Sequence, residues 1–251
     1  MTGIAAFALG LSAARSIKGQ TWAGDNTLFE PTNPVAITAP LICVYAGRGR
    51  SELRDKALDF AGDARLRFEV FLPPAFTAGG VTFNNEASQS LVFALIWRQI
   101  LAALTVQQAP WPNVFREILI RTHALECERD LFEPIKGQKI PVAVYELWGE
   151  TVADPPLGEA AAGVWTDFVA AMAGDTAELA GLASLFSAQI LGEGGALPDW
   201  QVAMGALGMT NEETQAIGLG PAVPANTLAA TDLADDAAAQ EIVTLTIDPL
   251  P

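Results

Sequence analysis

One stretch of the sequence, residues 86–104, constrains the fold more than any other, because it is apolar nearly all round at helical spacing. Its apolar positions are Leu91, Val92, Leu95, Ile96, Ile100, Leu101 and Leu104. A helix of this kind packs against a sheet rather than lying at the surface. Arg98 interrupts it, so no uncharged run reaches the ~18 residues needed to span a bilayer. The pattern predicts a long core helix, capped by Asn84 or Asn85, and no membrane-spanning segment.

Several segments with strand patterns supply a sheet for this helix to pack on. Residues 41–45 are a buried apolar run after Pro40, and residues 65–72 alternate between apolar and charged side chains. Residues 122–129 and 138–148 indicate an antiparallel pair, while 113–120 fits either a short helix or the start of a strand. Apolar positions also recur at helical spacing over residues 4–17. We therefore expect an α+β fold: a mostly antiparallel sheet packed by a long helix and an N-terminal helix, with a helical insertion before a final strand.

The C-terminal part differs in character from the rest. A linker at 154–158 is followed by helical patterns near 164–173, 175–191 and 199–207, and then by a stretch rich in Gly, Pro, Ala and Asp. Residues 242–247 alternate and are β-branched, which predicts a strand that rejoins the first sheet, because an isolated strand is unstable. We expect a core over 1–152, an acidic, Ala-rich helical lobe over 153–240 and a final strand within 241–251.

Charge is divided sharply along the chain. All 14 Lys and Arg residues lie at or before Lys139, so residues 140–251 carry 16 acidic and no basic side chains, and the net charge of −15 comes from this half. Nucleic-acid binders need clustered Lys and Arg, and an acidic surface repels phosphate. Such a balance favours a structural or assembly protein past which DNA moves without adhering. The apolar stretch 4–14 lacks the preceding basic residues of a signal peptide, so we expect the protein to be intracellular when made.

Reactive side chains form no recognisable catalytic pattern. Cys43 and Cys127 cannot make a disulfide framework, and both are expected to be buried thiols in strands. His123 is the one histidine and has no metal-ligand spacing around it. The Gly47–Arg50 loop lacks the spacing of phosphate-binding loops. We expect no catalytic residue, cofactor or metal, although a carboxylate pair such as a hydrolase uses stays open.

Two short phrases, in a fixed order with the predicted elements, carry a resemblance to a known family. The residues concerned are Thr21, Ala23 and Gly24 of a "T-x-A-G-x-R-V" phrase and Pro40, Ile42, Val44 and Tyr45 of a "P-x-I-x-V-Y" strand. The chain resembles the tail terminator proteins of long-tailed bacteriophages and related gene transfer agents over roughly residues 1–150 and the last strand. The arginine of the first phrase is absent here, with Asn26 in or next to its place.

This resemblance implies a structural virion protein at the neck end of the tail and not an enzyme. It implies a homo-hexameric ring that caps the tail tube, ends tube polymerisation and meets a head-tail connector or stopper protein, while DNA passes through. Function would then depend on surfaces. The residues we expect at inter-subunit or tube contacts are Arg48, Arg50, Arg54, Arg65 and Arg67.

Three other interpretations remain open at this stage. The first is another head-tail connector or stopper protein of the neck. The second is an acidic hydrolase with an undetected carboxylate pair, which a concave pocket with two carboxyl groups ~5–10 Å apart would favour. The third is an adaptor whose helical lobe binds a partner separately from the core.

Overall fold

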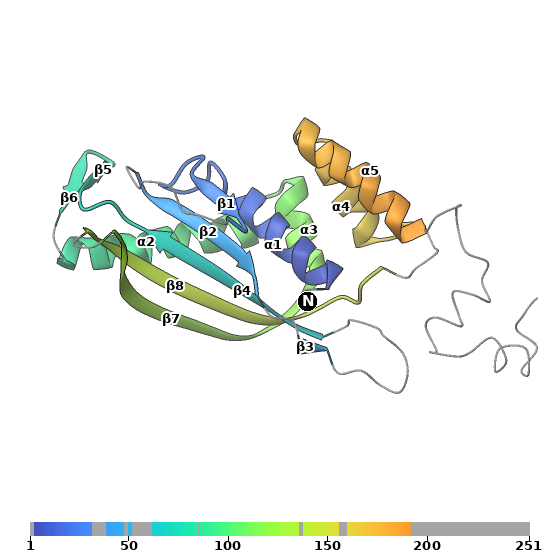
Figure 1. Cartoon of the computed structure of the whole chain (residues 1–251), viewed down its shortest axis with the longest axis horizontal. Coiled ribbons are helices and arrows are strands. Elements are labelled where there is room, and N and C mark those ends of the chain that lie inside the picture. The colour runs from blue at the N-terminus through green and yellow to red at the C-terminus, as the bar shows by residue number, and fades with distance from the viewer. Residues whose placement is uncertain are drawn as a thin grey trace, which may run out of the picture.

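The protein has the predicted α+β architecture, with a mostly antiparallel sheet packed by helices (Figure 1). The computed structural model describes residues 3–31, 39–47, 50–51, 62–84, 86–135, 138–155 and 160–191. The strands lie in the order β1 (Thr27–Phe29), β2 (Leu41–Ala46), β4 (Gly62–Phe71), β8 (Gln138–Thr151) and β7 (Leu119–Ile135). A short β3 (Arg50–Ser51) also pairs with β4, and β5 (Phe76–Ala78) and β6 (Val81–Phe83) form a separate hairpin.

The pairing within the sheet is antiparallel except where β1 runs parallel to β2. The alternating pattern of residues 65–72 produces β4: Leu66, Phe68 and Val70 are buried on one face, while Arg65, Arg67 and Glu69 are half-buried on the other. The predicted pair near 122–129 and 138–148 is the long hairpin of β7 and β8. β7 has no partner on its outer side among the described strands, so it forms an edge of the sheet.

The structure describes five helices, and most of them were predicted from the sequence. They are α1 (Ile4–Ile17), α2 (Glu86–Thr105), α3 (Pro110–Ile118), α4 (Val164–Ala173) and α5 (Ala177–Leu191). The ambiguous segment 113–120 is divided between two elements: residues 113–118 belong to α3, and β7 begins directly after it at Leu119. Pro110 opens α3, a position where its missing N–H costs no hydrogen bond.

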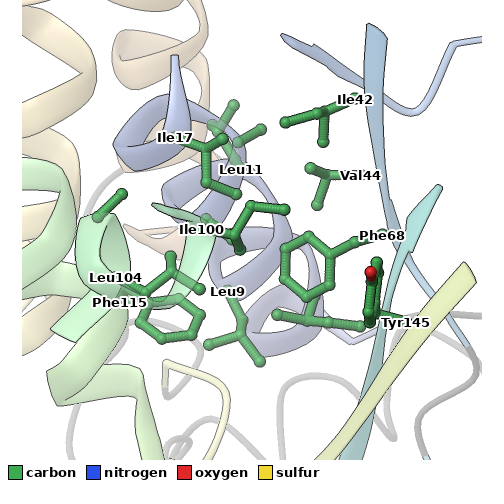
Figure 2. Close-up of a cluster of buried hydrophobic side chains, with 14 of the residues drawn as sticks. Leu9, Leu11, Ile17, Ile42, Val44, Phe68, Ile100, Leu104, Phe115 and Tyr145 are labelled. Carbon is green, nitrogen blue, oxygen red and sulfur yellow. The ribbon is translucent and has the colours of Figure 1, made fainter. Parts of the chain in front are cut away.

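One hydrophobic core joins the helices to a single face of the sheet (Figure 2). Side chains from β2, β4 and β8 on this face meet side chains from α1, α2 and α3: Ile42, Val44, Phe68 and Tyr145 on the sheet, and Leu9, Ile17, Ile100, Leu104 and Phe115 on the helices. α1 approaches the sheet very closely at Gly10. A Cβ there would lie 2.7 Å from the Phe29 ring and 2.9 Å from the Ala46 Cβ, so only glycine fits this contact.

The described part of the C-terminal lobe is packed onto this same core. Trp165, Phe168 and Met172 of α4 are buried in it, and α4 contacts α3. A polar contact reinforces the junction, because Asp175 accepts hydrogen bonds from the Arg15 Nε of α1 and the Trp111 Nε1 of α3, each at 2.7 Å. The helix expected near 199–207 and the strand expected at 242–247 lie outside the described residues.

The structure corrects one expectation about the cysteines. Cys43 is buried in β2 as predicted, but Cys127 is exposed. The local alternation around Cys127 is that of a half-buried strand. However, β7 is the edge strand, and each residue from Arg121 to Glu133 is exposed. The tertiary position of the strand, rather than its pattern, therefore sets the exposure of this thiol.

Among the described helices, α2 alone combines a membrane-spanning length with high hydropathy. Within it, Ser88–Thr105 is long and apolar enough to cross a membrane by length and composition, with a mean hydropathy of 1.2. Buried core helices have the same composition, and Val92, Ile96 and Ile100 of α2 are fully buried. The opposite side of the helix is exposed.

Candidate interaction surface

The face of the sheet opposite the helices is the surface on which the predicted arginines lie. Its apolar part is a small cluster made only of strand residues: Leu41, Cys43, Phe71, Ile140 and Val142, with Tyr45 and Val144 packed beside them. Its polar part follows from register, since residues paired across neighbouring strands point to the same side. Arg67 lies opposite Glu146, and Arg65 lies opposite Trp148.

Arg65 and Arg67, two of the predicted contact residues, are paired with carboxylates of their own chain. Arg65 donates to Glu146, and its guanidinium lies 5.2 Å from the centroid of the Trp148 ring. Arg67 lies 2.6 Å from the Glu69 carboxylate and 3.9 Å from that of Glu146. The Nε atoms of both arginines are buried and have no hydrogen-bond partner among the residues that the structure describes. The two side chains thus form a half-buried ion-pair network that leaves little net positive charge.

The other three predicted arginines are placed only in part. Arg48 and Arg54 lie outside the described residues. Arg50 begins β3, and its backbone pairs with that of Asp63 in β4. The structure therefore brings Arg65 and Arg67 together on one strand. Their role as contact residues between subunits stays a prediction.

A second polar group at one end of this face was not predicted. The His123 Nε2 of β7 lies 3.0 Å from the Asp63 Oδ1 of β4, and Arg121 lies 3.0 Å from the Glu150 carboxylate. Residues 63 and 123 are 60 positions apart, and their contact spans the intervening β8. Sequence alone identified His123 as a strand residue, but only the pairing register of three strands could have shown its partner.

A cleft of about 670 Å³ lies between α3 and α4, away from the predicted arginines. Carboxylates from three elements line it: Glu117 of α3, Asp167 of α4 and Asp175 of the turn that follows α4. Asp175 is already engaged by Arg15 and Trp111, whereas Glu117 and Asp167 are exposed. The cleft therefore presents negatively charged carboxylates beside the indole ring of Trp111.

The two phrases that carry the family resemblance come together in the structure. Thr21 to Asn26 form a tight turn after α1, in which Gly24 has a φ of +57°, a value that favours glycine. The carbonyl of Asn26 accepts a hydrogen bond from the Ile42 amide of β2 at 3.0 Å. The first phrase thus leads directly into β1, which runs along the strand formed by the second.

Comparison with protein-family models and with curated proteins finds no match for this chain. Among the described residues, no group of three or more His, Cys, Asp or Glu side chains is placed to hold a metal ion.

The two cysteines are expected to differ in reactivity. Burial, and then the charge of Glu69, raise the pKa of the Cys43 thiol to about 11, while Cys127 is exposed on the edge strand. A chromogenic disulfide reagent at pH 8 should titrate one thiol per native chain and two after denaturation in urea. Cys127→Ala should abolish the native reaction. Rapid labelling of two thiols in the native protein would contradict the buried position of Cys43.

The raised pKa of Cys43 also predicts how stability depends on pH. The neutral thiol is favoured in the folded state, so this contribution is complete below the unfolded pKa, near 9, and is lost as the pH rises toward 11. Two pKa units correspond to roughly 2–3 kcal/mol of unfolding free energy. Burial also raises the pKa values of Tyr45 and Tyr145, which adds to the same slope. Urea unfolding at pH 8 and pH 10.5 should show the loss, and Cys43→Ala should make the loss smaller.

Proposed function

We propose that this chain is a tail terminator of a long-tailed phage or a related gene transfer agent. Six copies form a ring at the neck end of the tail, cap the tail tube and present a surface to a head-tail connector or stopper protein. The observation that carries the proposal is the pair of sequence phrases, supported by their adjacency in the turn after α1 and in β2. The acidic C-terminal half suits a ring past which DNA moves without adhering.

The proposal is tested with the purified chain and a purified phage tail tube protein. Electron microscopy and mass measurement should show rings of six copies, and added protein should bind tube ends and stop their growth. Sedimentation should show fewer hexamers at high salt if Arg65, Arg67 and the other predicted arginines contact acidic neighbours, because salt screens exposed charges. A protein that stays monomeric and never binds tube ends would overturn the proposal. A twelve-fold ring bound to the connector would favour another neck protein instead.

The cleft between α3 and α4 supports a second candidate function, an acidic hydrolase. It is concave, and Glu117 of α3 and Asp167 of α4 both line it, so it offers two carboxylates to the acid–base chemistry that glycoside hydrolysis uses. A panel of chromogenic glycosides distinguishes the two candidates. The tail-terminator proposal expects no turnover, whereas turnover abolished by Glu117→Gln or Asp167→Asn would establish the hydrolase.

A further inference from the structure

The outward side of α2 is an apolar helix face that no described element covers. Leu91, Ala94, Arg98 and Leu101 are exposed, and their spacing of three, four and three residues places them in one stripe. Leu91 is 55 % exposed and Leu101 is 38 % exposed. Arg98 is the only charged residue between Ser88 and Thr105, and it has no ion-pair partner among the described residues. This face thus combines leucines with one free positive charge.

The outward side of α5 has the complementary composition. Glu178, Gly181, Leu182 and Leu185 are exposed along one side of this helix, with Leu182 at 41 % and Leu185 at 56 %. Glu178 is the only charged residue of α5, and the described residues offer it no cation. The far side of α5 is the one that packs inward, through Leu179, Ala183 and Ile190. This second face therefore combines leucines with one free negative charge.

We propose that these two faces bind each other between copies of the chain, with α2 of one copy antiparallel to α5 of the next. One register places the two charges opposite each other and covers the stripe from Leu91 to Arg98, while Leu101 lies beyond the start of α5. With Arg98 opposite Glu178, Leu91 falls opposite Leu185, seven residues away along each helix in opposite directions. Ala94 then falls opposite Leu182, and Leu95 opposite Gly181. The small residues allow the close approach of ~8–10 Å between axes that packed helices adopt.

The contact must form between copies because α2 and α5 do not pack on each other within the chain. α2 packs on the helix-covered face of the sheet, whereas α5 packs on α4 and lies apart from α2 (Figure 1). The division of charge also favours a second copy as the partner. The lobe has no Lys or Arg after Lys139, so the cation that Glu178 faces must come from the N-terminal part of a chain.

Such a contact joins two different surfaces, so it produces a closed ring when the rotation between subunits closes, and a filament otherwise. The number of copies, six, is taken from the proposed function, and the inference rests on that function to this extent. It adds to that function the two surfaces through which neighbouring subunits would meet.

Charge reversal provides the first test. Arg98→Glu and Glu178→Arg each place like charges in contact, and each should weaken assembly about tenfold or more, as measured by mass photometry over a concentration series. The double variant restores an opposite pair and should recover assembly to within about threefold of the original chain. Asp167→Arg is the matched control, since it reverses an exposed carboxylate of α4 outside the stripe. Single reversals that leave assembly unchanged would overturn the proposal, and so would a double variant that recovers nothing.

Disulfide trapping provides the second test and does not depend on the affinity. Leu91→Cys and Leu185→Cys are made in separate chains that also carry Cys127→Ala, which removes the exposed native thiol. Mild oxidation of the mixture should give a disulfide-linked dimer of the two different chains, which neither chain alone forms. Position 101 is the control, because Leu101→Cys falls outside the register opposite Leu185.

The outcomes separate this inference from the proposed function. Six-membered rings without the crosslink, or assembly insensitive to charge reversal, would reject the α2–α5 contact and leave the tail-terminator proposal intact. The crosslink and the charge rescue in an assembly that never binds tube ends would support the contact and reject that function. Binding of α2 to lipid vesicles, with no assembly at any protein concentration, would overturn the inference in favour of a membrane partner.

Discussion

Replacing Phe68 with alanine is expected to lower the free energy of unfolding by about 3–5 kcal/mol, because it leaves a large cavity at the centre of the core. Phe68 is fully buried in β4, and its ring meets that of Trp97 on α2 edge-to-face at 5.7 Å. The side chain therefore joins the sheet to the long helix (Figure 2). Small domains have a total stability of roughly 5–15 kcal/mol, so this variant should be close to unfolding at room temperature.

Urea denaturation followed by tryptophan fluorescence measures this effect, and the chain provides a matched control. Phe132 of β7 is 36 % exposed at the edge of the sheet and contacts Phe71 edge-to-face at 5.5 Å. Phe132→Ala removes the same atoms without opening a core cavity, so it should lower the free energy of unfolding by about 1 kcal/mol or less. Equal losses in the two variants would show that the core does not lie on the helix-facing side of the sheet.

Replacing Asp175 with alanine is expected to lower the free energy of unfolding by about 2–4 kcal/mol, since it leaves two partners unsatisfied. Asp175 accepts from Arg15 and from the Trp111 indole, and burial lowers the pKa of Arg15 by removing it from water. Side-chain exposures of 20 % for Arg15 and 14 % for Asp175 place the expected loss below that of a fully buried pair. The contact holds the α4–α5 lobe to α1 and α3, so its loss should loosen the lobe.

Two control variants and a proteolysis experiment distinguish this role from a general loss of surface charge. Asp167→Ala removes an exposed carboxylate of the same lobe and should change the free energy of unfolding by less than about 0.5 kcal/mol. Asp175→Asn keeps an oxygen that can accept from Trp111 but loses the charge that pairs with Arg15. Its free energy of unfolding should therefore lie between those of Asp167→Ala and Asp175→Ala. Limited proteolysis should cut Asp175→Ala faster between residues 153 and 163 than the original chain. An unchanged cutting rate would mean that the lobe is held by its apolar contacts alone.

Local patterns were sufficient to predict most of the fold. The helical patterns predicted α1, α2, α4 and all of α5, and the alternation of residues 65–72 predicted β4. These elements were accessible because helical and strand periodicities depend only on neighbouring residues in the chain. Segment 113–120 stayed ambiguous, because Pro110, which begins α3, can equally mark the end of a preceding helix. The short strands β1, β3, β5 and β6 carry too few residues for a pattern.

The interaction surfaces were far less accessible from sequence. Arg65 and Arg67 were predicted to lie on one side of a strand, and they do. Their pairing with Glu146 depends on β8, about eighty residues away, so no local signal indicates that their charge is neutralised. The carboxylates of the cleft come from segments separated by fifty residues and were equally hidden.

The amino-acid sequence by itself determined most of the helices and the longer strands, which side of each is apolar, and where the charge of the whole chain lies. Tertiary structure alone decided which of those sides are covered. Cys127 shows this most clearly, because its strand has a half-buried pattern, yet its place at the edge of the sheet leaves the thiol exposed. The same holds for the leucines on the outward faces of α2 and α5. Burial depends on elements that are distant in sequence, and only folding brings those elements together or leaves a face open for another chain.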